Sequence, residues 1–288
     1  MIGVIGGTGI TGSQLVTALQ ARAVEFRCIV RDPDAAKAKL GNDVELVRGD
    51  LSDTSSLESA MSGLDTLYIL CGHSPMLQQL EINALEAAKN SGVSYIVYAS
   101  GSEKGIRPDS PSKIMQMHYH VEEAIKSSGI DWAISRPNYF MSTLMSMAEP
   151  VAKMGKLITS LPKETGISMI HPTDIGEAAA EITLNRDRAG QTYFLTGPVI
   201  TMGQVLEEIS KAVGKSIEYV QVPPEAAEKA MKDKGMPDWL IAHVSGMMVG
   251  LVAGGDMGGV TDWVEQLTGH PPRTLDQWLD GAKGAFGG

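Results

Sequence analysis

The sequence predicts an α/β protein built on a doubly wound parallel sheet, with a smaller and mostly helical C-terminal part. Short apolar runs alternate with helix-length segments through the first two thirds of the chain, which is the pattern of repeated βα units. The runs are continuously apolar, and this indicates strands that are buried on both faces. A glycine-rich turn, Gly6–Gly12, joins the first run to the first helical segment.

Six apolar runs are the expected strands of the first part of the sheet. They are Met1–Ile5, Glu25–Arg31, Val44–Val47, Thr66–Cys71, Tyr95–Ser100 and Asp131–Arg136. The segments between them carry apolar residues at helical spacing. Gly92 and Gly129 follow the fourth and fifth of these segments, where helix stop signals are expected.

After Pro137 the rhythm changes. A methionine-rich helix is expected to lead into two strand-like pieces, a helix and a further strand, and the chain from Pro198 onward predicts four or five helices and one more strand. The pieces are Leu157–Ser160, Ile167–Met169, Pro172–Asn185, Gln191–Thr196 and Ile217–Gln221. We therefore expect a large domain over residues 1–197, with an excursion around 141–170, and a capping subdomain over residues 198–288. Gly254–Gly259 is either a simple connector or a lid.

Composition excludes several classes of protein. Hydrophobic residues make up 43% and charged residues 20% of the chain, as in ordinary globular proteins. The net charge of −10 disfavours binding to nucleic acid or to an anionic membrane surface. Two cysteines, Cys28 and Cys71, lie in apolar runs and are expected to be buried. Without a signal peptide, and with Leu240–Gly255 too short to span a bilayer, the sequence favours a cytoplasmic protein.

The glycine turn predicts a dinucleotide site. Gly6 permits a tight turn, Gly9 lets the backbone approach a pyrophosphate, and Gly12 lets the helix pack against the strand. The amides of the first helical turn and the helix dipole then face the anion. Residues expected to contact the cofactor here are Gly6, Thr8, Gly9, Ile10, Thr11 and Gly12.

The ends of the next strands add to this site. Arg31 is the first polar residue after the second strand and suits a 2′-phosphate, so NADP(H) is expected to be preferred and NAD(H) remains possible. Asp50 can accept from the adenine amine, with Leu51 against the ring; the alternative role, a helix N-cap, suits Asp53 or Ser52 better. Leu70, Cys71 and Gly72 end the fourth strand, where small residues let the backbone approach the cofactor.

These motifs run the length of the chain and resemble those of a known family. They are GGTGITG at Gly6–Gly12, VRDP at Val30–Pro33, GDLSD at Gly49–Asp53, IVYASG at Ile96–Gly101, EEAIKSSGI at Glu122–Ile130, SRPNYFM at Ser135–Met141, HPTDIGEAAAE at His171–Glu181, LTGP at Leu195–Pro198 and LTGHPPRTLDQW at Leu267–Trp278. The sequence is similar to atypical short-chain dehydrogenases/reductases of the NmrA-like family. The resemblance implies a Rossmann domain that binds NADP(H) or NAD(H), in a family that includes quinone and dye reductases and non-catalytic redox sensors.

The usual catalytic apparatus of short-chain dehydrogenases is incomplete in this sequence. Ser100 matches their serine, at the end of the fifth strand, and is expected to contact the cofactor as well. Ile114 and His118 occupy the positions of the Tyr-x-x-x-Lys pair. His118 shares an apolar helix face and therefore points inward, either as a proton donor or as a core histidine.

The loop after the sixth strand is the expected substrate floor, because ligands of such sheets bind beyond the carboxyl ends of the strands. Tyr139 is a further candidate catalytic residue, and the candidate substrate contacts are Asn138, Phe140, Met141 and Met145. Core packing is the alternative role for the methionines. The histidines at 118, 120 and 171 lack ligand spacing, so no metal site is expected.

Two functions compete on these grounds. The first is an NAD(P)H-dependent reductase that transfers a hydride to a small electron-poor acceptor, such as a quinone, a dye or an iminium-like centre. The second is a non-catalytic sensor of NAD(P), which the missing Tyr-Lys pair favours. A sugar-nucleotide epimerase is disfavoured because the tyrosine that would oxidise the sugar is absent. The expected partner is a small molecule, and the chain is expected to be a monomer or a homodimer.

Overall fold

The computed structural model describes residues 1–254 and 259–288. A seven-stranded parallel sheet forms its centre, in the order β3-β2-β1-β4-β5-β6-β9. The strands are β1 (Ile2–Ile5), β2 (Phe26–Val30), β3 (Glu45–Arg48), β4 (Thr66–Ile69), β5 (Tyr95–Ala99), β6 (Asp131–Pro137) and β9 (Gln191–Leu195). The order reverses beside β1, as in a doubly wound sheet, so the predicted fold class is confirmed.

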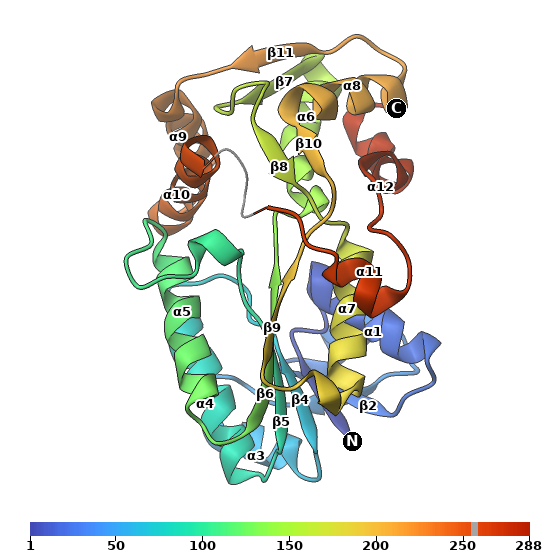
Figure 1. Ribbon diagram of the computed structural model, residues 1–288, viewed down its shortest axis with the longest axis vertical. Helices are drawn as coiled ribbons and strands as arrows, with labels where there is room; N and C mark the ends of the chain where they lie inside the picture. Colours follow the sequence, from blue (N-terminus) through green and yellow to red (C-terminus); the bar gives the residue numbers. More distant parts are fainter. Residues whose placement is uncertain (255–258) are drawn as a thin grey trace.

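Helices cover both faces of the sheet, as Figure 1 shows. One face carries α3 (Thr54–Met61), α4 (Leu77–Asn90) and α5 (Lys113–Lys126), and the other carries α1 (Ile10–Ala21) and α7 (Pro172–Leu184), with α2 (Pro33–Leu40) beside β2. Each face has its own apolar core, which explains why the strands read as continuous apolar runs. Gly92 and Gly129, with φ of 78° and 82°, follow α4 and α5 as predicted.

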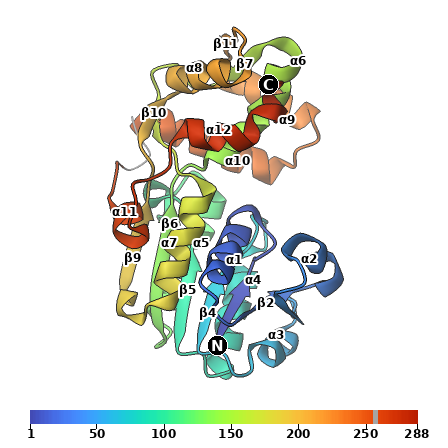
Figure 2. The ribbon, with the colours of Figure 1, turned by 90° about the vertical axis from the view of Figure 1, so that its right-hand side faces the viewer.

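The smaller part lies beyond the carboxyl ends of the strands (Figure 2) and is built from two stretches of the chain. The earlier stretch contributes a 3₁₀ helix (Met141–Met147), α6 (Ala148–Met154), β7 (Lys156–Thr159) and β8 (Gly166–Ser168). The later one contributes β10 (Val199–Thr201), α8 (Met202–Val213), β11 (Glu218–Gln221), α9 (Pro224–Asp233), α10 (Asp238–Gly254) and α12 (Leu275–Ala282). Two short sheets, β10-β8 and β11-β7, join the stretches.

Three details differ from the sequence-based expectations. The methionine-rich segment begins as a 3₁₀ helix at Met141 and turns α-helical only at Ala148. Strand β10, at Val199–Thr201, was not predicted; it is only half-buried and exists because it pairs with β8, which lies far from it in sequence. Helix α11 (Trp263–Thr268) packs on α7 and β9 of the large domain, where Trp263 meets Tyr193 with ring centroids 4.9 Å apart.

Residues 255–258, in the predicted glycine-rich loop, lie outside the described residues. Over the rest of the chain, every helix is either too short or too polar to cross a membrane.

Candidate active site

The glycine loop lies between β1 and α1, at the carboxyl edge of the sheet. Gly6 has a φ of 84°, and a Cβ there would stand 2.2 Å from the carbonyl oxygen of Leu70. A Cβ on Gly12 would stand 2.1 Å from the carbonyl oxygen of Gly6, so this glycine permits the helix to pack on the loop. Around Gly9, in contrast, the closest atom would be 3.4 Å away. The protein leaves the space over Gly9 open.

Helix α1 starts directly after Gly9, and no side chain caps it. The N–H groups of the first helical turn cannot bond within the helix, so those of Ile10, Thr11 and Gly12 remain available to a ligand. Ile10 is 65% exposed although it is apolar. An open glycine before an uncapped helix end has the form of an anion site, and it fits the pyrophosphate of a dinucleotide.

Arg31 follows β2 beside this loop and is exposed. The adjacent carboxylate, Asp32, accepts a hydrogen bond from the amide of Ala35 at 3.0 Å and is the N-cap of α2. Arg31 forms no ion pair with any residue that the structure describes. The guanidinium is therefore available to a ligand, while the carboxylate that would hold ribose hydroxyls is engaged elsewhere.

Asp50 and Asp53 have different roles: Asp53 is a helix N-cap, and Asp50 is a candidate contact for the base. Asp53 caps α3 through the amide of Ser56 at 3.2 Å, as the sequence predicted. Asp50 binds the amide and hydroxyl of Ser52 through Oδ1 at 2.9 and 2.7 Å, and these bonds lower the pKa of Asp50. Its second oxygen, together with the half-buried Leu51, remains a candidate for contact with the base.

Ser100 lies at the end of β5 and carries a buried hydroxyl that has no partner among the described residues. A buried hydroxyl without a partner is costly, and a bound ligand at this edge of the sheet would relieve that cost. Leu70, Cys71 and Gly72 follow β4 at the same edge, and Gly72 has no atom within 4 Å of the position that a Cβ would take. The observed residues thus fit a dinucleotide that crosses the carboxyl edge.

His118 lies on α5, is 3% exposed and points inward, as predicted. Its Nδ1 stands 2.5 Å from the hydroxyl of Tyr98 on β5. The same hydroxyl is 2.7 Å from Oε2 of Glu81 on α4, and the amide of Cys71 donates to Oε1 of Glu81 at 3.2 Å. Burial raises the pKa of Glu81 to about 8, against the effect of its hydrogen bonds, and lowers the pKa of His118 to about 3.

Two further histidines complete this cluster. The ring of His73, after β4, meets the ring of His118 edge-on with centroids 5.8 Å apart. It also meets His243 of α10, with centroids 4.8 Å apart. His243 Nδ1 lies 2.7 Å from the hydroxyl of Ser112, the N-cap of α5. The smaller part of the molecule thereby reaches the site through α10.

The buried histidines His118 and His243 determine whether their titration raises or lowers stability as the pH changes. Burial lowers the pKa of His243 to about 4 and that of His118 to about 3, so both are neutral in the folded protein at pH 5. In the unfolded chain they bind protons below a pH of about 6.5. We expect the free energy of unfolding to fall as the pH drops below about 6.5, with a contribution on the order of 1–3 kcal/mol per histidine.

Urea denaturation of wild type and His243→Gln at about pH 7.5 and about pH 5 measures this contribution. The variant should lose less stability on acidification than wild type does. Equal losses in the two proteins would contradict a neutral, buried His243.

The loop after β6 is less open than the sequence suggested. Asn138 is 2% exposed; its Oδ1 accepts from Ser102 at 2.9 Å and its Nδ2 donates to the carbonyl oxygen of Ser168 at 3.0 Å. Met141 is 1% exposed, within the core of the smaller part. Tyr139 and Phe140 are half-buried, and Met145 is 44% exposed. Of the predicted substrate contacts, Phe140 and Met145 present surface, whereas Asn138 and Met141 are engaged in the structure itself.

Tyr139 packs against the same core, and burial raises the pKa of its phenol, against the effect of a hydrogen bond with Thr143. The group therefore stays protonated near neutral pH. No described contact joins Tyr139 to the His118 cluster, so the structure does not bring the two candidate proton donors together.

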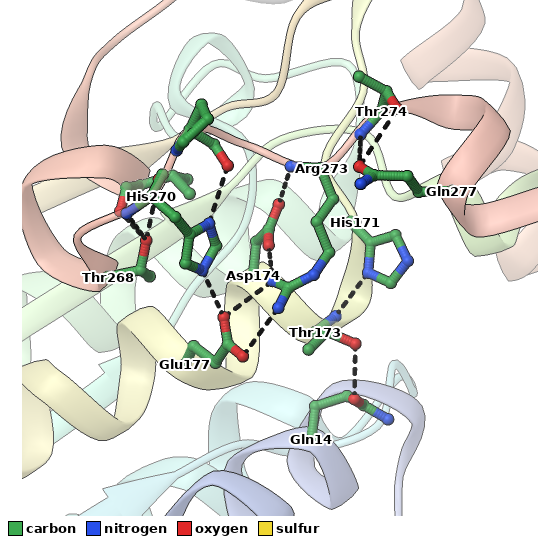
Figure 3. Close-up of polar contacts among 12 residues, drawn as sticks. Gln14, His171, Thr173, Asp174, Glu177, Thr268, His270, Arg273, Thr274 and Gln277 are labelled. Carbon is green, nitrogen blue, oxygen red and sulfur yellow. Dashed lines mark hydrogen bonds and ion pairs between the residues drawn. The ribbon is translucent and has the colours of Figure 1, made fainter.

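A separate polar cluster ties the C-terminal segment to α7 (Figure 3). Arg273 donates through Nη1 and Nη2 to Glu177 at 2.8 and 3.0 Å, and through Nη1 and its backbone amide to the fully buried Asp174. His270 Nε2 lies 2.8 Å from Glu177. Asp174, Glu177 and His270 are close enough to hold a cation, but the guanidinium already supplies the positive charge there.

Sequence reasoning missed Glu81, Tyr98, His73 and His243. Glu81 carried the clearest signal, because it is an acidic residue on the apolar stripe that Leu77 and Ala84 form along α4. A carboxyl on the buried face of a helix requires a partner. That partner, Tyr98, is hidden in a strand that reads as continuously apolar.

The profile of the NmrA-like family matches residues 1–257. The chain belongs to the NmrA-like family. Among its relatives, the NAD(P)H azoreductase of Xenophilus azovorans is 31% identical over 288 residues, which are 100% of this chain and 99% of the relative. Quinone oxidoreductase 2 of Escherichia coli is 27% identical over 96% of each chain.

Two solved structures share the fold. The NADPH-dependent quinone oxidoreductase of Escherichia coli, complexed with NADPH, superposes with a TM-score of 0.88 at 26% identity, over 98% of this chain and 99% of that one. The triphenylmethane reductase of Citrobacter sp., complexed with NADP(H), superposes with a TM-score of 0.84 at 21% identity, over 98% and 100%. The predicted family and its Rossmann architecture are thus confirmed, and the named relatives are oxidoreductases, the predicted enzyme class.

Proposed function

We propose that this NmrA-like protein is an NADPH-dependent reductase that transfers a hydride to a small electron-poor acceptor of the quinone, azo or dye type. The observation that carries the proposal is the open glycine loop at the uncapped end of α1, beside Arg31, which forms no ion pair with any described residue. The azoreductase and quinone oxidoreductase among its relatives support the reaction class.

Different residues of the chain would bind different parts of the cofactor. The amides of Ile10, Thr11 and Gly12 would bind the pyrophosphate, and Arg31 would pair with the 2′-phosphate. Ser100, with its unpartnered hydroxyl, would bind the part of the cofactor nearest the end of β5. When bound, the reduced nicotinamide supplies the hydride.

The chemistry of the acceptor follows from what the site lacks. Hydride transfer to an ordinary ketone builds a basic alkoxide and needs a strong, well-placed acid. Here Ile114 and His118 stand where a Tyr-Lys pair would provide one, and burial keeps His118 neutral. An electron-poor acceptor gives a delocalised or neutral product, so positioning and exclusion of water can supply most of the acceleration.

Absorbance of the reduced cofactor tests the proposal. NADPH would be incubated with the protein and with a benzoquinone, an azo dye, a triphenylmethane dye and an aliphatic ketone. We expect turnover of at least one electron-poor acceptor and none of the ketone. Tight binding of NADPH without turnover of any acceptor would instead indicate a dinucleotide sensor.

Arg31 sets an expected cofactor preference. A bidentate guanidinium–phosphate contact contributes about 1.5–3 kcal/mol, or roughly tenfold to a hundredfold in affinity. We expect Arg31→Ala to weaken NADPH binding by that factor and to leave NADH binding nearly unchanged. Calorimetric titration of both cofactors measures the difference. A wild-type protein that binds the two equally would show that Arg31 does not contact the 2′-phosphate.

A further inference from the structure

Glu81, Tyr98 and His118 form a continuous hydrogen-bonded row from α4 across β5 to α5, on the left-hand face of the sheet in Figure 1. The exposed fractions of the three side chains are 0%, 0% and 3%. The row lies near the carboxyl edge of the sheet. Tyr98 is the penultimate residue of β5, and Glu81 and His118 lie in the first turns of α4 and α5, which begin at that edge. Buried polar groups of this kind are retained only when they are mutually satisfied.

The tyrosine hydroxyl has one proton and two neighbours that could accept it. In one arrangement, neutral Glu81 donates to the oxygen of Tyr98, Tyr98 donates to Nδ1 of His118, and His118 carries its proton on Nε2. In the other, Tyr98 donates to ionised Glu81, and His118 donates to Tyr98 through a proton on Nδ1. Both arrangements satisfy every hydrogen bond in the row. They differ by one proton in total, and that proton is lost or gained at Nε2.

The Nε2 atom is the open end of the row. Nδ1 is occupied by Tyr98, and no residue in the described part of the chain forms a hydrogen bond with Nε2. The ring of His73 packs edge-on against the rings of both His118 and His243 and so connects α5 with α10.

We propose that Glu81, Tyr98 and His118 form a proton relay that delivers one proton through Nε2 of His118 to the reduced acceptor. The proposal rests on the proposed function and deepens it. His118 is the residue that touches the acceptor, and Tyr98 and Glu81 act through it. The relay serves acceptors that become anions on receiving a hydride, namely azo compounds and quinones.

The protons and electrons of the step balance. The acceptor first gains two electrons and one hydrogen as hydride from the reduced dinucleotide, which leaves a negative charge on its second nitrogen or oxygen. That atom forms a bond to the proton of Nε2 as the Nε2–H bond breaks. Nδ1 takes the proton of Tyr98, and Tyr98 takes the proton of Glu81. The row ends with a carboxylate at Glu81, and a proton from solvent at Nε2 later restores it.

A relay solves a problem that His118 alone could not. Burial lowers the pKa of His118 to about 3, so the imidazolium is absent at neutral pH. A neutral imidazole that lost its only proton would become an anion, which is far more costly. Burial raises the pKa of the Glu81 carboxyl to about 8 and so keeps it protonated at neutral pH. Glu81 can therefore replace the lost proton through Tyr98, and the negative charge ends on the carboxylate and not on the imidazole.

The charges packed around the row are consistent with a neutral resting state. Cys71 donates its amide to Oε1 of Glu81, the oxygen that does not face Tyr98. On α5, Glu122 is held by Arg136 and Lys126. Burial lowers the pKa of His243 to about 4 and also lowers the pKa of His73. Burial raises the pKa of the Cys71 thiol to about 11, against the effect of the Arg31 charge at the end of β2.

The first test reads the proton positions without turnover. Nitrogen-15 NMR of the imidazoles would follow the tautomer of His118 from about pH 6 to about pH 9.5, a range that brackets the titration of Glu81. We expect the Nε2–H tautomer at the lower pH and the Nδ1–H tautomer at the higher one. In Glu81→Gln, the side-chain carbonyl oxygen would accept from the amide of Cys71 and the NH2 group would donate to Tyr98, so the Nε2–H tautomer should persist throughout. The relay is overturned if His118 titrates to imidazolium near pH 6.5. It is also overturned if the His118 tautomer shows the same pH dependence in wild type and in Glu81→Gln.

The second test uses acceptors that differ in their need for a proton. At saturating NADPH, Glu81→Gln and Tyr98→Phe should lower kcat for an azo dye and a benzoquinone by about tenfold to a hundredfold, within the range of acid catalysis. A cationic triphenylmethane dye becomes neutral on receiving a hydride, so its kcat should change less than about twofold. Tyr95→Phe is the matched control, because Tyr95 is a buried tyrosine of the same strand that donates to the carbonyl oxygen of Ile182 at 3.0 Å.

The outcomes separate the relay from the proposed function. Equal losses for all acceptors, or losses in Tyr95→Phe as large as in Tyr98→Phe, would assign the row a structural role and overturn the relay. Unchanged kcat in both relay variants would overturn it as well. If wild type turns over no acceptor, the proposed function fails, and the tautomer measurement still decides whether the protons are shared as described.

Discussion

Replacing Gly9 with valine is expected to weaken NADPH binding by orders of magnitude while the protein stays folded. Gly9 has φ −83° and ψ 174°, an extended conformation that valine adopts readily. A Cβ there would meet only the carbonyl oxygen of Gly6, at 3.4 Å. The added methyl groups would occupy the space over the first turn of α1, where a pyrophosphate must come close to the amides.

The size of the effect follows from the bonds that are lost. Each charge-assisted hydrogen bond from a backbone amide to phosphate contributes about 1.5–3 kcal/mol. Losing two of them weakens binding by a factor on the order of 10²–10⁴. Isothermal titration calorimetry gives the Kd, and urea denaturation without cofactor should show a change in stability of less than about 0.5 kcal/mol.

Gly12→Ala is the contrasting variant. Its Cβ would stand 2.1 Å from the carbonyl oxygen of Gly6, so the loop and α1 must move apart. We expect this change to destabilise the fold itself, whereas Gly9→Val should not. An unchanged NADPH affinity in Gly9→Val would place the cofactor elsewhere.

The shape of the glycine loop is predictable from the sequence, because strand, turn and helix are contiguous there. A Cβ on Gly12 would meet the carbonyl oxygen of Gly6, which is local, whereas the constraint on Gly6 comes from Leu70, which follows β4. Asp32 and Asp53, the N-caps of α2 and α3, are predictable because their contacts are also local. The apolar face of α5 likewise predicts that His118 points inward, because helical period alone determines it.

Partners that are distant in sequence were not predictable. Glu81, Tyr98 and His118 meet because α4 and α5 pack on the same face of the sheet, and no local pattern specifies that register. Asn138 looked like a substrate contact because it follows a strand. Its side-chain amide is instead hydrogen-bonded to Ser102 and Ser168. Ser168 belongs to the excursion around 141–170, which contributes to the smaller part.

The smaller part of the fold has the same limitation. Its core combines residues from the excursion around 141–170 with residues after 199, and the strand pairs β8-β10 and β7-β11 join the two stretches. The sequence of a short strand such as β10 contributes little to the stability of that strand. Their existence depends on a partner that becomes available only once the chain has folded.

Replacing Arg273 with methionine should cause the largest loss of stability among the substitutions considered. Asp174 has no exposed surface, and its carboxylate is bonded to the side chain and the backbone amide of Arg273 (Figure 3). Removing one partner of a buried ion pair leaves the other charge uncompensated and costs about 3–5 kcal/mol. The Arg273 side chain is 28% exposed, so water can reach Asp174 in the variant, and we expect about 3 kcal/mol.

The control is an exposed pair of the same charges. Lys153 and Glu149 are 2.8 Å apart with side chains 72% and 58% exposed, and Lys153→Met should leave the free energy of unfolding nearly unchanged. A double variant, Arg273→Met with Asp174→Asn, should recover part of the loss because it removes the buried charge. Urea denaturation measures all three, and a loss in Arg273→Met no larger than in Lys153→Met would contradict a stabilising buried pair.

The position of this ion pair links stability to the site. Arg273 lies between α11, which packs on the large domain, and α12, which belongs to the smaller part. Its bonds to Asp174 and Glu177 therefore fix the point at which the chain returns from one part to the other. If the pair is broken, limited proteolysis should cut the segment around His270–Thr274 faster than in wild type, while Lys153→Met should not change the rate. Cleavage at an unchanged rate would show that packing of α11 and α12 alone holds the segment in place.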